Sequence, residues 1–194
     1  MRNICALLAL AGTAAIASAG YTMHWYWTGP ATLNPGDTGH YTLYSKFASG
    51  PGEPLVGYAG SIFEITANAS DVGGFISNGN GNDLLGDLSP EDGTQIDNNN
   101  IVGIDTFQLP PFFNPLYSYD NPIWVYELDI TVNAPGTVTL TTQNHLNHSV
   151  YVSNMGANVE STPTIDAFRI TVVPTPASLG LIGLGGLVAA RRRR

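Results

Sequence analysis

The segment IWVYELDITV, residues 123–132, decides the fold class of this chain. Hydrophobic and polar side chains alternate along it with a period of two, which is typical of a half-buried β-strand. The residues predicted to face a core are Trp124, Tyr126, Leu128, Ile130 and Val132. Those predicted to face water are Val125, Glu127, Asp129 and Thr131. A turn signal, Ala134-Pro135-Gly136, and an alternating segment at 137–141 follow, so the pattern predicts a β-hairpin.

The same period recurs in six further segments, and clusters of Asn, Pro, Gly and Ser separate many of them. The predicted strands are 21–27, 41–47, 61–67, 101–109, 149–153 and 165–173, with turns at 34–37, 49–54, 78–82 and 98–100. No convincing helical period occurs between Gly20 and Thr175. Short strands with such punctuation are typical of an antiparallel sandwich. We therefore expect an all-β, Ig-like or jelly-roll-like domain over residues 20–172.

Residues 1–19 have the pattern of a secretory signal peptide. Arg2 is their only charge, an apolar run follows, and Ala17-Ser18-Ala19 provides a small-residue cleavage site. We expect a signal helix that the secretion machinery uses and that is then removed. Cys5 would leave with it, so the mature chain would have no cysteine, which excludes disulfides and thiol catalysis.

The region between Gly20 and Thr175 is strongly acidic. It holds all fifteen Asp and Glu residues but only Lys46 and Arg169 as cations, which gives a formal charge of −13. Phosphate binding needs clustered Lys and Arg, so this charge excludes nucleic acid as a partner. It is compatible with divalent cations or a high-salt medium, and it also keeps a protein soluble.

Residues 173–194 differ in composition from the predicted domain. Pro174 and Pro176 flank Thr175, and an uncharged segment rich in Gly and Leu covers residues 177–190. As a helix this segment would span roughly 20 Å, less than a bilayer core of about 30 Å. We expect a weak, transient membrane anchor rather than a stable span. The chain ends in a basic cluster that would stay in the cytoplasm: Arg191, Arg192, Arg193 and Arg194.

This layout resembles the PEP-CTERM sorting tail, which combines a Pro-x-Pro signature, an apolar segment and a terminal arginine cluster. The resemblance implies removal by an exosortase-type membrane transpeptidase and delivery to the cell surface or extracellular matrix, commonly in association with exopolysaccharide. Thr175 stands where the family usually has Glu. An ordinary C-terminal anchor or a buried apolar peptide is the alternative. The central domain is only generically similar to cohesin-like and carbohydrate-module sandwiches.

A calcium site is the one cofactor that the sequence suggests. NGNGNDLLG, residues 78–86, matches much of the glycine-rich nonapeptide of calcium-binding β-rolls, but those rolls need tandem copies. Oxygen-rich loops suit calcium, and the candidate ligands are Asp83, Asp87 and Asp92. A solvated acidic loop is the alternative. His145 and His148 are too few for zinc, which needs three or four ligands.

Two carboxylates on one strand raise the hypothesis of a glycan hydrolase. Glu127 and Asp129 would lie about 6.5–7 Å apart along the strand, near the separation of an inverting glycosidase pair. A general acid, however, needs a cleft that raises its pKa, and this strand face is predicted to be open to water. We therefore expect a protein that is not an enzyme, with no catalytic residue, and keep hydrolysis as the second alternative.

Aromatic residues supply the first alternative function, a carbohydrate-binding module. Trp25 and Trp27 share one strand face, which is predicted to be core. The proline-rich loop 110–119 either packs over one end of the sandwich or exposes rings that stack on sugars. The candidate stacking residues are Phe112, Phe113, Tyr117 and Tyr119.

Overall fold

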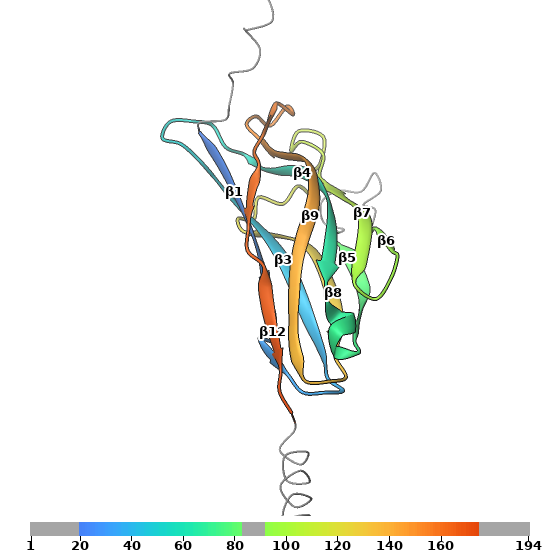
Figure 1. The fold of residues 1–194 in the computed structure, drawn as a ribbon. Helices are drawn as coiled ribbons and strands as arrows, with labels where there is room; N and C mark the ends of the chain where they lie inside the picture. The colour runs from blue at the N-terminus through green and yellow to red at the C-terminus, as the bar shows by residue number, and fades with distance from the viewer. Residues whose placement is uncertain (1–19, 83–91, 175–194) are drawn as a thin grey trace, which may run out of the picture.

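Two β-sheets pack face to face in the computed structural model, which describes residues 20–82 and 92–174 (Figure 1). Sheet A has the strand order β11-β1-β3-β8-β5. Sheet B has the order β2-β12-β9-β4-β7-β6, and β10 pairs with β9. Strand pairs are antiparallel except β1–β11 and β2–β12, which are parallel and lie at sheet edges. The predicted all-β antiparallel sandwich is confirmed.

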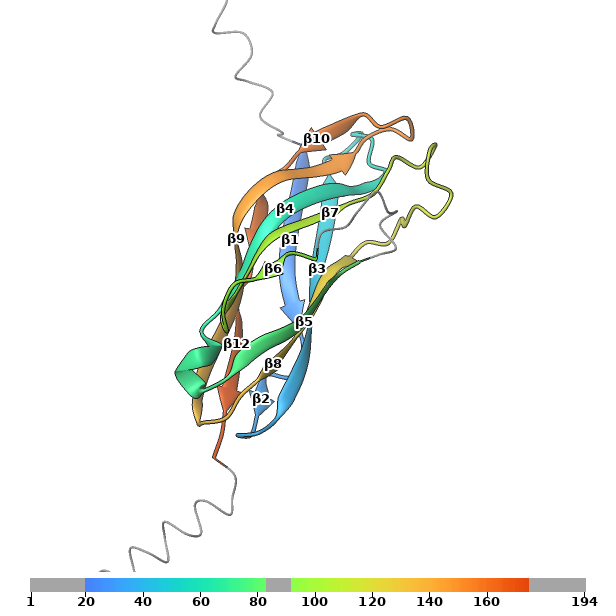
Figure 2. The same ribbon diagram turned by 90° about the vertical axis from the view of Figure 1, so that its right-hand side faces the viewer.

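The strands alternate between the two sheets along most of the chain. Sheet A contains β1 (Tyr21–Thr28), β3 (Thr38–Ser49), β5 (Phe75–Gly81), β8 (Ile123–Thr131) and β11 (Pro163–Ile165). Sheet B contains β2 (Thr32–Leu33), β4 (Gly57–Ala67), β6 (Thr94–Gln95), β7 (Asn100–Phe107), β9 (Gly136–Tyr151), β10 (Asn158–Glu160) and β12 (Phe168–Val172). Figure 2 shows β4, β7 and β9 in one layer, with β3, β5 and β8 in the other. A short 3-10 helix, η1 (Ala69–Val72), links β4 to β5.

The predicted hairpin of β8 and β9 is wrong, because these strands lie in different sheets. β8 pairs with β3 and β5, whereas β9 pairs with β12, β4 and β10. The backbone N–H groups of Asn133 and Ala134 both donate to the carbonyl of Val72, at 3.0 and 2.9 Å. The turn is therefore held against η1, and the chain crosses from one sheet to the other.

A β-bulge in β8 changes the direction of its first side chains. Leu43 pairs with Tyr126, but the next residue, Tyr44, pairs with Trp124, so Val125 is an additional residue in the strand. Val125 is buried, and Trp124 is half-buried on the opposite face. The predictions for these two residues are wrong, because a strict period of two does not allow for an inserted residue. Alternation holds from Tyr126 onward.

The predicted turn at 78–82 is largely part of β5, an edge strand that pairs with β8. The pairing is irregular between Ser77 and Asn80, and Asn78 has a positive φ of 51°. Asn and Gly favour such left-handed conformations. Here that preference produces an irregularity within a strand instead of a chain reversal.

The core between the sheets is rich in aromatic side chains. Trp25 and Trp27 are both buried, as predicted. Trp25 packs edge-on against Phe63, with ring centroids 4.9 Å apart. Its Nε1 donates to Ser45 Oγ at 3.0 Å. The other largest buried side chains are Tyr41, Tyr58, Tyr126, Met23, Leu43, Ile65, Ile76, Ile104 and Ile123.

The first and last strands place the two ends of the described chain at opposite ends of the sandwich. β1 starts at one end and β12 finishes at the other (Figure 1). The predicted signal segment 1–19 and the sorting tail from Thr175 onward lie outside the described residues, as do the helices predicted for them. Within residues 20–82 and 92–174, no helix is both long enough and apolar enough to cross a membrane.

Candidate functional site

Three aromatic side chains form a row across the outer face of sheet A. Tyr26 of β1 pairs with Tyr44 of β3, and Tyr44 pairs with Trp124 of β8. All three are half-buried. The rings of Tyr26 and Tyr44 are nearly parallel, at 18°, with centroids 5.7 Å apart. Because neighbouring strands lie about 4.8 Å apart, the row extends over about 10 Å. We call these three residues the aromatic platform.

The β-bulge completes this platform. In a regular strand, Trp124 would share the inward face of Tyr126, as the sequence pattern predicted. The inserted residue, Val125, turns the indole to the outer face beside Tyr44. A local irregularity in β8 therefore provides the largest of the three rings.

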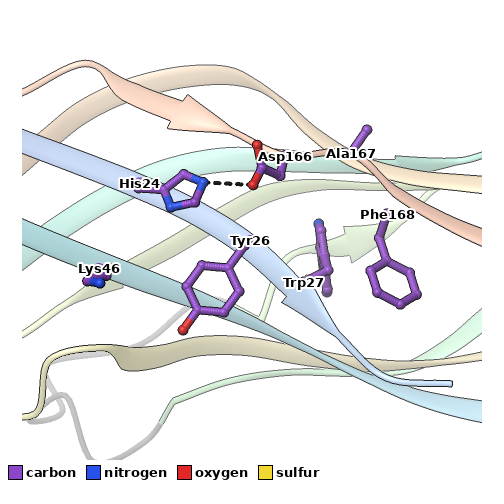
Figure 3. A pocket seen from close by; sticks show the side chains of 7 residues that line it. All are labelled: His24, Tyr26, Trp27, Lys46, Asp166, Ala167 and Phe168. Atoms are coloured by element: carbon purple, nitrogen blue, oxygen red, sulfur yellow. Dashed lines mark hydrogen bonds and ion pairs between the residues drawn. The ribbon is translucent and has the colours of Figure 1, made fainter. Parts of the chain in front are cut away.

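An open pocket of about 500 Å³ adjoins the platform at Tyr26 (Figure 3). His24 Nε2 lies 2.8 Å from Asp166 Oδ2 at its rim. These side chains are 43% and 62% exposed, so solvent screens the pair and it adds little stability. Figure 3 shows the Tyr26 ring face-on. The remaining lining residues are Trp27, Lys46, Ala167 and Phe168.

Trp27 brings a buried polar atom without a partner to the wall of this pocket. The residue is 4% exposed, and its Nε1 has no hydrogen-bond partner in the described part of the chain. Figure 3 shows this nitrogen on the side of the indole toward Asp166 and Ala167. Buried polar groups are nearly always paired, and an unpaired one costs about 1–3 kcal/mol. An oxygen atom that came within hydrogen-bond distance of this nitrogen from the pocket would satisfy the donor.

A group of polar side chains on the same face of sheet A is internally paired. His40 Nδ1 lies 2.9 Å from Asp129 Oδ1, and His40 Nε2 lies 3.4 Å from Glu127 Oε2. Asn78 Nδ2 donates to Asp129 Oδ2 at 2.7 Å. Asn80 Nδ2 donates to Glu127 Oε1 at 3.3 Å. We call these five residues the polar cluster. Its four carboxylate oxygens all have partners within the fold.

The polar cluster is poorly suited to proton donation. Partial burial raises the pKa of Asp129, but hydrogen bonds from Asn78 and His40, together with the charge of His40, outweigh it and hold that pKa below its usual value. A general acid needs the opposite shift. Glu127 and Asp129 thus connect β8 to β3 and β5 through side-chain hydrogen bonds.

The proline-rich loop exposes three of the four rings suggested for sugar stacking. Phe112, Phe113 and Tyr119 are 66%, 59% and 61% exposed. Tyr117 is buried, and its hydroxyl donates to the Tyr58 carbonyl at 3.0 Å. Its ring packs against the sandwich and is not available to a ligand. Phe112 and Phe113 contact each other edge-on, with centroids 5.0 Å apart.

Only one of the three suggested calcium ligands lies in the described part of the chain. Asp92 Oδ1 accepts a hydrogen bond from the Gly81 backbone at 2.7 Å, which ties this residue to β5. Asp83 and Asp87 lie outside the described residues. No group of three or more His, Cys, Asp or Glu side chains is placed to hold a metal among residues 20–82 and 92–174.

The remaining residues that the sequence pointed to either belong to the folded domain or lie outside the described residues. His145 and His148 belong to β9, where His148 is buried and its Nδ1 lies 2.8 Å from Ser61 Oγ. Pro174 is exposed at the end of the described chain. The sorting residues outside it are Thr175, Pro176, Arg191, Arg192, Arg193 and Arg194.

The aromatic platform was not predicted from the sequence, although part of its signal is present there. Tyr26 lies between Trp25 and Trp27, so the alternation that places those two in the core also places Tyr26 outside. The position of Trp124 depends on the bulge, and its neighbours depend on strand pairing. Neither follows from local periodicity.

The comparisons with known proteins identify the fold. No family model matches the chain, and no curated protein matches it. The seventh type I cohesin of ScaB from Pseudobacteroides cellulosolvens is 14% identical, with a TM-score of 0.57, over 79% of this chain and 94% of that chain. A cohesin module of a family 33 glycoside hydrolase from Clostridium perfringens is 7% identical, with a TM-score of 0.54, over 79% and 98%.

A third similar structure comes from a type I cohesin–dockerin complex of Clostridium thermocellum. It is 14% identical, with a TM-score of 0.53, over 78% of this chain and 99% of that chain. At these identities the likeness concerns the fold alone. The chain has a cohesin-like jelly-roll sandwich that accounts for nearly the whole length of these modules.

Proposed function

We propose that this protein is an exported, non-enzymatic protein of the cell surface or extracellular matrix, delivered by its PEP-CTERM-like tail and associated with exopolysaccharide. The main support for this proposal is the outer face of sheet A. It presents a row of aromatic rings to solvent, and the carboxylates beside them are committed to hydrogen bonds within the fold. Such a surface suits the binding of a ligand better than its hydrolysis.

The position of the chain ends supports delivery by the tail. β12 finishes at the end of the sandwich opposite the start of β1 (Figure 1). Pro174, which follows β12, is exposed, so a membrane enzyme could reach this end of the domain without unfolding the sheets. Removal of the four terminal arginines would also leave a more acidic product.

Mass spectrometry of the exported protein tests this delivery. We expect a mature chain that starts after Ala19 and has lost the arginine cluster. A variant in which the four arginines are replaced by alanine should accumulate as an unprocessed, membrane-associated precursor. A wild-type exported chain that still ends at Arg194 would contradict the proposed sorting.

A second candidate function is the binding of a protein partner. The fold is that of cohesin modules, one of which was solved in a cohesin–dockerin complex. On the outer face of sheet B, Ile62 pairs with both Asp105 and Leu146, and Leu146 is 61% exposed. This apolar spot on an acidic domain would fit a basic partner with an apolar anchor. Leu146→Asp should abolish recovery of such a partner, whereas Tyr44→Ala should not.

A further inference from the structure

We propose that the aromatic platform and the adjoining pocket form one binding site for an extended, uncharged polysaccharide. The inference rests on the proposed association with exopolysaccharide, to which it adds a site and a class of ligand. Sugar rings lie against Tyr26, Tyr44 and Trp124. A sugar oxygen enters the pocket and accepts a hydrogen bond from Trp27 Nε1.

The platform has the shape and chemistry that a sugar chain requires. The C–H groups on the faces of a pyranose ring are apolar and carry small positive charges, and the face of an aromatic ring is negative. Tyr26 is seen face-on in Figure 3, and the Tyr44 ring is within 18° of parallel to it. The three rings come from adjacent β-strands, so little conformational freedom is lost on binding.

The row also has a suitable length. Two strand spacings of about 4.8 Å place the outermost rings about 10 Å apart, a span comparable to two consecutive sugar units of an extended chain. A single small molecule would cover only part of this row. The arrangement therefore favours a polymer that lies across the strands.

The pocket supplies polar contacts at one end of the row. Trp27 Nε1 is a buried donor without a partner among the described residues. At the rim, Asp166 offers acceptors and Lys46 offers donors. A sugar hydroxyl both donates and accepts, so it fits this mixed set. Filling the pocket would remove the cost of the unpaired indole N–H.

The charge of the domain selects against acidic polysaccharides. The described residues contain twelve Asp and Glu side chains but only Lys46 and Arg169 as Lys or Arg. A field of this sign repels a polyanion at long range. Lys46 lines the pocket, but one lysine does not offset that repulsion. The field therefore excludes acidic polysaccharides, and stacking of apolar sugar faces on the aromatic rings needs no charge on the ligand.

The test uses the exported protein and titrates it with hydroxyethyl cellulose, xyloglucan, galactomannan and, as a polyanion, alginate. We expect binding to at least one neutral polymer and weaker binding to alginate. Tyr44→Ala should weaken neutral binding by about tenfold or more, because a ring-sized apolar contact is lost. Tyr44→Phe should keep it. Trp27→Phe, which removes only the indole donor, should also weaken it.

A matched control lies on the same sheet face. Phe75 is 40% exposed on β5, where its partner across the pair is Thr131 of β8, beyond the polar cluster. Phe75→Ala should bind as the wild type does. Circular dichroism of each variant verifies that the fold is intact.

Three results would overturn the site: no binding to any neutral polymer, a preference for alginate, or wild-type affinity in both Tyr44→Ala and Trp27→Phe. The mass of the mature C-terminus separates this failure from failure of the proposed delivery. A processed protein that binds no neutral polymer would refute the site and leave delivery intact. A chain that still ends at Arg194 but binds a neutral polymer would refute the proposed delivery and leave the site intact.

Discussion

The aromatic platform and the polar cluster lie on the same face of sheet A, but they differ in whether the polar groups beside them are paired within the fold. In the polar cluster, His40, Asn78 and Asn80 pair with the carboxylates of Glu127 and Asp129. Beside the platform, a buried indole nitrogen has no partner in the described part of the chain. The carboxylates of the polar cluster therefore have all their partners within the fold, whereas the indole N–H beside the platform lacks an acceptor among the described residues.

The same contrast occurs within a single strand. Trp25 and Trp27 both lie on the inner face of β1, and both are buried. Trp25 Nε1 donates to Ser45 Oγ, whereas Trp27 lines an open pocket and its Nε1 has no partner among the described residues. A group paired within the fold adds to stability, and an unpaired buried group costs stability until a ligand or water pairs with it. We therefore assign the polar cluster to stability and the platform to binding.

The largest effect on stability is expected from the polar cluster. Asp129→Ala removes the acceptor of His40 and Asn78. Because His40 is 57% exposed, water replaces part of what is lost, so the free energy of unfolding should fall by about 1–1.5 kcal/mol. Urea unfolding measures this, and affinity for a neutral polysaccharide should stay unchanged in the folded variant. Asp120→Ala, at an exposed site, should change stability by less than about 0.5 kcal/mol. Equal stability of Asp129→Ala and Asp120→Ala would contradict the assignment of the polar cluster to stability.

A smaller difference should separate the two core tryptophans. Trp25→Phe and Trp27→Phe remove the same atoms from buried positions, but only the first breaks a described hydrogen bond, to Ser45. Trp25→Phe should therefore be less stable than Trp27→Phe by about 1 kcal/mol. Thermal or urea unfolding of both proteins gives this difference. The reverse order would show that Trp27 is the better paired residue.

Acid should weaken the polar cluster before it affects the platform. The pKa of Asp129 is lowered in the fold, so its contribution to stability is present above the unfolded value of about 3.9 and is lost as pH falls through the lower folded value. The contribution of Asp129 to the free energy of unfolding should be nearly constant from about pH 7 to 5 and fall below about pH 4. Asp129→Asn should lose less on acidification than the wild type, and an equal loss would contradict this role.

The smallest effect is expected in the proline-rich loop. Phe112 and Phe113 are exposed and contact each other, but they do not belong to the platform. The double variant Phe112→Ala, Phe113→Ala should keep both the wild-type stability and its polysaccharide affinity. Affinity electrophoresis compares it with Tyr44→Ala. A larger loss in the loop variant would move the binding site to this loop.

Local patterns predicted the all-β fold and much of the core. Alternation needs only neighbouring residues, and it correctly buried Trp25, Trp27 and the second half of β8. It failed where one residue is inserted, at Val125, and where Asn78 makes an irregular edge strand instead of a turn. The supposed β8–β9 hairpin failed because strand pairing depends on residues far apart in the sequence.

These failures explain why the platform could not be predicted. Tyr26, Tyr44 and Trp124 are separated by long stretches of chain and meet only through the order β1-β3-β8. The rings of the loop at 112–119 were predicted to stack on sugars because they lie close together in the sequence. Proximity in the sequence was a poor guide to which aromatic rings form a common surface.

The indole N–H resonances of the three tryptophans give the most direct test of the platform. The exported protein, labelled with nitrogen-15, would be titrated with an oligosaccharide of the neutral polymer that binds, and Trp→Phe variants would assign each signal. We predict that the Trp27 and Trp124 signals shift with saturation while the Trp25 signal, paired with Ser45, stays in place. Three unmoved signals, or a Trp25 shift as large as that of Trp27, would contradict the account.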